Sequence, residues 1–293
     1  MTTALVPPAS FAASASTNEQ TYTLTAGDFE RVRQVIYQRA GISLHTGKQA
    51  MVYSRLSRRL RETQHASFAE YLQWLDRATG AEAESEWQEF VNCLTTNLTA
   101  FFREDHHFHA LVDDLKARAS TAQGRPLRIW CNAASTGEEP YSLAMTVVES
   151  LGLSAPAKLV CSDIDTKVLA TAQRGVYAAD ARGLSPERMK RHFMRGTGNN
   201  AGHIRVKPEL ARLIEFRSFN LMSSGWGTLG EAFDIVFCRN VMIYFDNPTQ
   251  RQVLERIHGV MKPGGLLYVG HSENFTDARD LFRLRGKTIY ERV

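Results

Sequence analysis

The segment from Leu127 to Met145 constrains the fold more than any other part of the chain. Its sequence, LRIWCNAASTGEEPYSLAM, predicts a buried strand, a loop of small residues from Asn132 to Gly137, and an apolar helix that opens at Glu138. A strand that turns tightly into a helix through a glycine-containing loop lets a ligand approach the backbone at the carboxyl edge of a parallel sheet. The segment therefore predicts an α/β fold with a nucleotide-like ligand at that edge.

The charge of this loop narrows the choice of ligand. Glu138 and Glu139 would repel a pyrophosphate but attract a cation. The loop also lacks the Gly-Lys-Ser/Thr sequence with which phosphate-binding loops hold phosphates. A ligand with a cationic end and no phosphate fits best, and S-adenosylmethionine is such a molecule.

A second acidic motif follows the next predicted strand. Lys158 to Cys161 is a short apolar run, and Ser162-Asp163-Ile164-Asp165 then precedes a helix. Asp163 lies about 25 residues beyond the first loop, where a strand-end carboxylate in this kind of fold accepts hydrogen bonds from a ribose diol. Asp163 or Asp165 could instead only cap the helix. With two acids present, both roles can be filled.

Two later segments extend the same pattern. Ala232 to Cys238 predicts a third strand, and Asn247-Pro248 predicts a helix start with Asn247 as its cap. That helix is expected to end in the Met-Lys-Pro-Gly-Gly sequence at 261–265, before a strand from Leu266 to Gly270. A helix, a Lys-Pro-Gly-Gly turn and an apolar strand in this order are typical of class I methyltransferases.

Four motifs together resemble those of the CheR-type chemotaxis receptor methyltransferases. They are TNLTAFFRE at 96–104, AASTGEEPYS at 133–142, SDID at 162–165 and FCRNVMIYF at 237–245. The resemblance spans about residues 22–293, in the family's order. It implies an α/β, Rossmann-like class I methyltransferase domain with an inserted antiparallel β subdomain, preceded by a small all-α domain. It also implies methyl transfer from S-adenosylmethionine to glutamate side chains of chemoreceptors, which gives glutamyl methyl esters and S-adenosylhomocysteine.

The expected organisation has four parts. These are a disordered tail over 1–21, a helical domain over 22–95, a linker over 96–110 that contributes to the cofactor site, and the methyltransferase domain over 111–293. The inserted β subdomain is expected at about 176–217, with short strands at His203–Lys207 and Leu213–Arg217. An exposed edge of such a sheet could capture an extended peptide by strand addition, and the resemblance implies that this peptide is a receptor tether. The subdomain could instead be a lid that only shapes the active site.

The resemblance assigns roles to the residues that match the family's motifs. Glu138 is expected to face the methionine amino group, Asp163 the ribose, and Asn220-Leu221 the adenine. The linker residues Asn97, Thr99 and Arg103 are expected to close over the cofactor, and Arg239 and Asn240 to line its cleft.

Two of the matched residues are expected to act in catalysis. Tyr244 should lie near the transferring methyl group, and Arg103 near the substrate carboxylate. Tyr244 could instead be a packing residue beside Ile243 and Phe245. A glutamate with a pKa near 4.3 is already ionised at neutral pH, so the attacking carboxylate needs no general base.

A basic helix is the candidate docking surface for the receptor. The region from Arg31 to Arg61 carries eight basic residues and no acid. On a helix from Lys48 to Thr63, Arg55, Arg58 and Arg59 are expected to cluster on one face. The face could be merely solvated, but in the family this helix faces the acidic methylation helices of the receptor.

Other ligands and locations are disfavoured. Nucleic acid has little support because the net charge is only +4 and the basic run lacks interleaved aromatic residues. His106, His107 and His109 lack the ligand geometry of a zinc site, so no metal is expected. The chain has neither a signal-peptide pattern nor a run of eighteen apolar residues, and its four cysteines have neither metal nor redox spacing. A cytoplasmic protein without membrane insertion is expected.

Two alternatives to receptor methylation remain open. One is a methyltransferase for another protein or a small molecule, and the other is a non-catalytic receptor adapter that binds S-adenosylmethionine as a sensor. Intact Arg103 and Tyr244 favour catalysis over the adapter, and the basic face and inserted sheet favour a large protein substrate.

Overall fold

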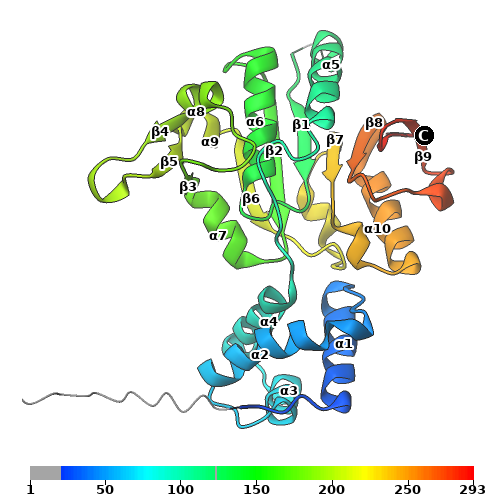
Figure 1. The fold of residues 1–293 in the computed structure, drawn as a ribbon. Helices are drawn as coiled ribbons and strands as arrows, with labels where there is room; N and C mark the ends of the chain where they lie inside the picture. Colours follow the sequence, from blue (N-terminus) through cyan, green and yellow to red (C-terminus); the bar gives the residue numbers. More distant parts are fainter. Residues whose placement is uncertain (1–20, 123) are drawn as a thin grey trace, which may run out of the picture.

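The computed structural model describes residues 21–122 and 124–293, which form a helical domain beneath an α/β domain (Figure 1). The tail predicted to be disordered falls outside these residues, except for its last position. The helical domain contains α1 (Ala26–Ala40), α2 (Gln49–Glu62), α3 (Phe68–Arg77) and α4 (Ala81–Leu94), with a short 3-10 helix, η1 (Thr46–Lys48), between α1 and α2.

Side-chain caps fix where the first helices begin. Thr25 and Asp28 form a reciprocal capping box at the start of α1, and the Ser67 hydroxyl accepts a hydrogen bond from the Glu70 N–H at the start of α3. Along α2, Val52, Leu56 and Leu60 are fully buried, as their spacing predicts.

The α/β domain is built on a seven-stranded sheet. Its strands are β1 (Leu127–Cys131), β2 (Ala157–Asp163), β6 (Ile214–Ser218), β7 (Phe233–Cys238), β8 (Met261–Val269), β9 (Phe282–Gly286) and β10 (Ile289–Arg292). The spatial order is β6-β2-β1-β7-β8-β10-β9; the first five strands in this order are parallel, and β10 and β9 are antiparallel. The helices around it are α5 (His106–Thr121), α6 (Glu138–Leu151), α7 (Thr166–Arg174) and α10 (Asn247–Val260). The predicted Rossmann-like architecture is confirmed.

The two faces of the sheet belong to two different cores. Ile129 points to the face covered by α5 and α6, whereas its neighbour Trp130 points to the face covered by α10. The core around Trp130 continues without interruption into the helical domain and includes Val52 and Phe90. The two domains therefore share apolar packing as well as a chain connection.

The inserted subdomain is a three-stranded antiparallel sheet in the order β3-β5-β4. Its strands are β3 (Val176–Ala178), β4 (Phe193–Arg195) and β5 (His203–Val206), accompanied by α8 (Pro186–His192), η2 (Gly198–Asn200) and α9 (Pro208–Ala211). The assignment of Leu213–Arg217 to this insert was wrong. That segment is β6, which pairs in parallel with β2 at the edge of the main sheet, and a short half-buried strand carries no local signal of the sheet it will join.

The loops after β6 and β7 contain short 3-10 helices, η3 (Gly225–Leu229) and η4 (Met242–Tyr244), and η5 (Thr276–Ala278) precedes β9. The prediction of Asn247 as the cap of α10 was wrong by one residue, because the Asp246 carboxylate accepts the hydrogen bond from the Thr249 N–H at 3.0 Å. In the part of the chain that the structure describes, no helix is both long enough and apolar enough to cross a membrane.

Candidate active site

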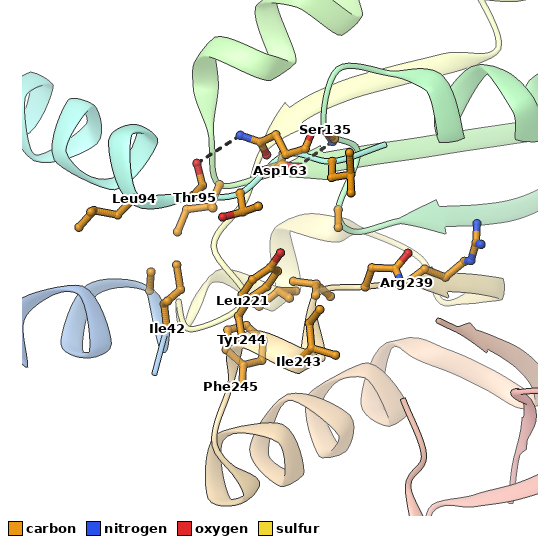
Figure 2. Close-up of a pocket in the computed structure, with 18 of the residues that line it drawn as sticks. Ile42, Leu94, Thr95, Ser135, Asp163, Leu221, Arg239, Ile243, Tyr244 and Phe245 are labelled. Carbon is orange, nitrogen blue, oxygen red and sulfur yellow. Dashed lines mark hydrogen bonds between the residues drawn. The ribbon is translucent and has the colours of Figure 1, made fainter. Parts of the chain in front are cut away.

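A cavity of about 410 Å³ lies between the two domains at the carboxyl edge of the parallel strands (Figure 2). One wall comes from the loop between α1 and α2 and from the linker after α4. The opposite walls come from the loops that follow β1, β2, β6 and β7. In open α/β sheets, ligands bind in this position.

The structure brings nearly all of the residues predicted for cofactor binding and catalysis to this one cavity. Those that line it are Asn97, Thr99, Arg103, Asp163, Asn220, Leu221, Arg239, Asn240 and Tyr244. Tyr244 and Asp163 lie on opposite walls (Figure 2). Within the described residues we find no hydrogen bond to the Tyr244 hydroxyl, which leaves it available to a ligand.

Glu138 is the exception, because it does not line the cavity. Its carboxylate accepts a hydrogen bond from the Thr136 hydroxyl at 2.6 Å, at the N-terminus of α6. The next residue, Glu139, lines the cavity instead. Successive residues of a helix point about 100° apart, so only one of two adjacent glutamates can face the ligand, and the sequence alone does not say which.

The loop before these glutamates passes close to α7. Gly137 has φ +101°, and a Cβ there would lie 2.5 Å from the Tyr177 hydroxyl and 2.9 Å from the Ala172 Cβ. Only glycine combines this backbone conformation with so close an approach. The tight strand-to-helix turn predicted from the sequence therefore depends on this residue.

Asp163 is a buried carboxylate, 8% exposed, at the end of β2. It accepts hydrogen bonds from the Ser135 N–H at 2.8 Å and the Asp165 N–H at 2.9 Å. Burial raises the pKa of Asp163 to about 6, and these hydrogen bonds only partly oppose the shift. Asp165 caps α7 by accepting from the Lys167 and Val168 N–H groups. One acid therefore caps the helix, and the other remains free to face a ligand.

A buried charge network lies behind the cavity wall. The guanidinium of Arg239, 4% exposed, contacts Glu139 at 2.5 Å and Glu104 at 3.2 Å. Burial opposes the charge of Arg239, but the two carboxylates outweigh it and raise its pKa. Burial would likewise raise the pKa of Glu104, yet His271, Arg239 and Asn240 hold it at about 2. Two carboxylates against one guanidinium leave a net negative charge, which suits a cationic ligand.

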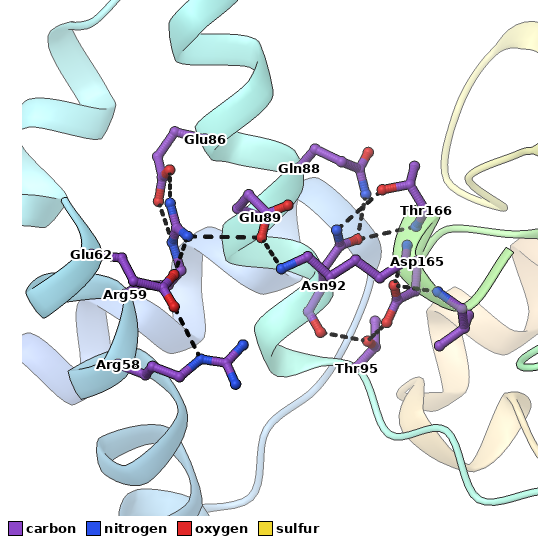
Figure 3. A network of polar contacts seen from close by, with 12 residues as sticks. Arg58, Arg59, Glu62, Glu86, Gln88, Glu89, Asn92, Thr95, Asp165 and Thr166 are labelled. Carbon is purple, nitrogen blue, oxygen red and sulfur yellow. Dashed lines mark hydrogen bonds and ion pairs between the residues drawn. The ribbon is translucent and has the colours of Figure 1, made fainter. Parts of the chain in front are cut away.

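A set of polar contacts fixes the linker and the last helix of the helical domain against the start of α7 (Figure 3). The Thr95 hydroxyl donates to Asp165 at 2.7 Å, and the Asn97 amide donates to the same oxygen at 2.8 Å. From α4, the Gln88 amide donates to the Ile164 carbonyl at 2.8 Å. The Asn97 side chain is thus engaged with the protein and sets the path of the linker across the cavity.

The motifs did not single out Glu273, which holds another wall of the cavity. Its carboxylate is 3% exposed and accepts hydrogen bonds from the backbone N–H groups of Asn240 at 2.9 Å, Met242 at 2.8 Å and Gly270 at 2.6 Å. Burial raises the pKa of Glu273, and these donors oppose the shift. Glu273 lies outside the four motifs, and a single glutamate between two strands carries no signal of this role.

The cavity fits S-adenosylmethionine by the chemistry of its walls. It offers the buried carboxylates of Glu139, in the first turn of α6, and of Asp163, at the end of β2, together with apolar surface from Leu221 and Ile42. The side-chain amide of Asn132, beside the Cys238 thiol, is buried in the same wall and satisfies neither its nitrogen nor its oxygen by hydrogen bonds within the described residues. A buried amide of this kind calls for a polar ligand.

The predicted common basic face on α2 was wrong for two of its three residues (Figure 3). The Arg59 side chain is 13% exposed and forms ion pairs with Glu86 and Glu62. Arg55 donates to the Thr95 carbonyl at 2.6 Å, at the end of α4. Only Arg58 has a largely exposed side chain, at 62%, with Glu62 at 3.4 Å. Of the acids beside Arg59, Glu62 is the last residue of α2, whereas Glu86 and Glu89 come from α4 and could not be revealed by a count along α2.

One group of potential metal ligands occurs among the described residues, formed by Glu104, His106 and His107. Glu104 is already committed to Arg239 and to His271, and burial lowers the pKa of His107 to about 4. His109 does not belong to the group.

Comparison with known proteins agrees with the division of the chain. Residues 27–95 match the model of the CheR methyltransferase all-alpha domain, and residues 97–290 match that of the CheR methyltransferase SAM-binding domain. Chemotaxis protein methyltransferase 2 of Pseudomonas aeruginosa is 54% identical, over 92% of this chain and 95% of that protein. The chemotaxis protein methyltransferase of Escherichia coli is 48% identical, over 91% of each chain. With both domain models in order and the cavity between them, the chain belongs to the CheR family of S-adenosylmethionine-dependent methyltransferases.

Proposed function

We propose that the protein transfers a methyl group from S-adenosylmethionine to glutamate side chains of chemoreceptors, in the cytoplasm, and so forms glutamyl methyl esters. The single observation that carries this proposal is the interdomain cavity, which gathers the family's motif residues together with the buried carboxylates of Glu139 and Asp163. The names of relatives 48–54% identical to this chain, chemotaxis protein methyltransferases, supply the substrate class.

The cavity suggests how its residues would hold the cofactor. Asp163 is placed to accept hydrogen bonds from the ribose hydroxyls, and the wall at Asn220-Leu221 offers backbone groups and apolar surface for the adenine. The Asn220 amide itself donates to the Arg39 carbonyl at 2.6 Å. We assign the methionine ammonium group to Glu139 rather than Glu138, because only Glu139 lines the cavity. The Glu139 carboxylate would share this contact with Arg239 and the Cys131 thiol, which already donate to it.

The reaction mainly requires the protein to align the receptor carboxylate with the methyl group of the cofactor. The bound cofactor supplies a methyl carbon activated by an adjacent sulfonium. Arg103 would hold the receptor carboxylate by its charge, and Tyr244 would position the reacting groups from the opposite wall. Because the attacking glutamate is already ionised at neutral pH, no side chain needs to remove a proton. Packing of the receptor over the cavity would exclude water from the two opposite charges that react.

The inserted subdomain is a second candidate contact for receptors. Its outer strands β3 and β4 carry the half-exposed side chains of Val176 and Met194. An extended receptor tether could pair with such an edge by strand addition. Binding of a labelled receptor C-terminal peptide, compared between the wild type and Met194→Asp, would test this part of the proposal.

The decisive experiment supplies labelled S-adenosylmethionine and receptor-containing membranes. We expect label in the receptor that alkali releases as methanol, since esters are base-labile and amides are not. Label in small molecules only would favour the small-molecule alternative. Cofactor binding without any transfer would favour the non-catalytic adapter.

A further inference from the structure

Two large apolar side chains stand exposed at the mouth of the cavity. Leu98, on the linker, is 78% exposed, and Ile243, directly before Tyr244, is 51% exposed. Several other large apolar side chains are exposed in the described residues, yet only these two also line the cavity. They come from segments far apart in the sequence, and Ile243 is directly followed by Tyr244, the residue expected near the transferring methyl group.

The position of Leu98 makes it prominent on the surface. The linker residues Leu98, Thr99 and Arg103 also line a second, open cavity of about 740 Å³ on the other side of the linker. Leu98 therefore lies on a ridge between two hollows, and the described residues leave its side chain open to contact with another molecule.

Two cations lie at the same mouth. Lys48 is exposed, and Arg103 is half-buried, with its guanidinium donating to the Leu98 carbonyl at 2.8 Å. Within the described part of the chain neither forms an ion pair, whereas most arginines of α2 do or are otherwise engaged. The mouth therefore combines apolar contact with unpaired positive charge, which complements an amphipathic, acidic segment.

We propose that Leu98 and Ile243 form an apolar rim that receives a side chain three or four positions from the acceptor glutamate on a receptor helix. This inference rests on the proposed function. Residues three or four apart lie on one face of a helix, so when the glutamate enters the cavity toward Tyr244, these neighbours face the rim. Arg103 holds the acceptor carboxylate itself, and Lys48 then contacts an acidic residue of the same helix. The rim selects glutamates that have an apolar neighbour at this spacing.

The test compares Leu98→Ser and Ile243→Ser with the matched control Leu284→Ser. Leu284 is 57% exposed on β9 and does not line the cavity. We expect KM for the receptor to rise about 5- to 20-fold in each rim variant, as for loss of one partly buried aliphatic contact. The control should match the wild type, and calorimetry should give the wild-type Kd for S-adenosylmethionine in all three.

A receptor variant makes the test specific. In this receptor, serine replaces the apolar residue three or four positions from the acceptor glutamate. The replacement should raise KM with the wild-type enzyme but should cause little further increase in KM with the Leu98→Ser/Ile243→Ser double variant. Unchanged KM in the rim variants would overturn the proposal. A weaker Kd for S-adenosylmethionine that accounts for the whole loss would also overturn it, by assigning both residues to the cofactor site. Failure of the wild type to methylate any receptor glutamate would instead refute the proposed function.

Discussion

Glu139 and Arg239 form an ion pair 2.5 Å long in the wall of the cofactor cavity, 100 positions apart in the sequence. The pair joins the first turn of α6, the helix that follows β1, to the loop after β7, and β1 and β7 are neighbouring strands of the sheet. Because Glu104 also contacts Arg239, the guanidinium does not neutralise both acids. The remaining negative charge is available to the cationic end of the cofactor.

The first prediction distinguishes the two adjacent glutamates. Glu139→Gln should weaken S-adenosylmethionine binding by about 10- to 100-fold, since hydrogen bonds to charged groups contribute about 1.5–3 kcal/mol. The matched variant Glu138→Gln should bind nearly as the wild type does, because Glu138 does not line the cavity. Calorimetry on both folded proteins provides the measurement, and the opposite ranking would restore Glu138 to the cofactor site.

The second prediction concerns pH. The pKa of Asp163 is raised to about 6, so in the free protein its carboxylate gains a proton as the pH falls through 6. The protonated form is a poorer acceptor for the ribose hydroxyls, and cofactor affinity should therefore fall between pH 7 and pH 5. In Asp163→Asn the affinity should be lower at pH 7, by about 1–3 kcal/mol, and this pH dependence should vanish. If the cofactor affinity of Asp163→Asn still falls between pH 7 and pH 5, a group other than residue 163 must cause the pH dependence.

The third prediction separates chemistry from cofactor binding. Tyr244→Phe removes one hydroxyl that has no hydrogen bond within the described residues, so folding and S-adenosylmethionine affinity should be retained. The methylation kcat should fall, by about tenfold if the hydroxyl aligns the reacting groups. Single-turnover measurements with saturating cofactor give this value. A loss confined to cofactor affinity would remove Tyr244 from the catalytic set.

The fourth prediction revises the docking test on α2. Arg59→Glu would place a fourth acid beside Glu62, Glu86 and Glu89 and should destabilise the helical domain by about 3–5 kcal/mol, as for a broken buried pair. Arg58→Glu, at an exposed position, should change stability by about 0.5 kcal/mol or less. Denaturant unfolding checks both values. If Arg58 contacts the acidic receptor, its variant should also lose part of the salt dependence of methylation; an unchanged rate at low salt would assign docking to the cavity rim.

The contrast between Asp163 and Arg59 shows what sequence alone could predict. Asp163 follows a strand, and strand ends of a parallel sheet converge at one edge, so its place in the cavity follows from local pattern and topology. The surroundings of Arg59 depend on Glu86, which is brought to it by packing of α4 against α2. Similarly, β6 has the local pattern of any short edge strand, and only its partner β2 assigns it to the main sheet. Local sequence patterns predicted which segments form helices and strands. Packing between these elements determined the surroundings of Arg59 and the sheet that β6 joins.

The last prediction tests Glu273 as a positioning residue for the loop that carries Tyr244. Its carboxylate accepts hydrogen bonds from the N–H groups of Asn240, Met242 and Gly270, and Asn240 has φ +57°, a conformation that costs energy for a residue with a side chain. In Glu273→Gln one acceptor oxygen becomes an NH₂ group that faces N–H donors, so stability should fall by about 1.5–3 kcal/mol. The control Glu255→Gln removes an acid that is 52% exposed on α10 and should have little effect.

Because Glu273 does not line the cavity, a purely structural role would lower the folded fraction without changing kcat per folded molecule. A positioning role instead predicts a lower kcat at saturating cofactor and receptor, measured well below the melting temperature of the variant. Recovery of kcat in Glu273→Asp without full recovery of stability would support a positioning role. A wild-type kcat in folded Glu273→Gln would show that the carboxylate contributes to stability only.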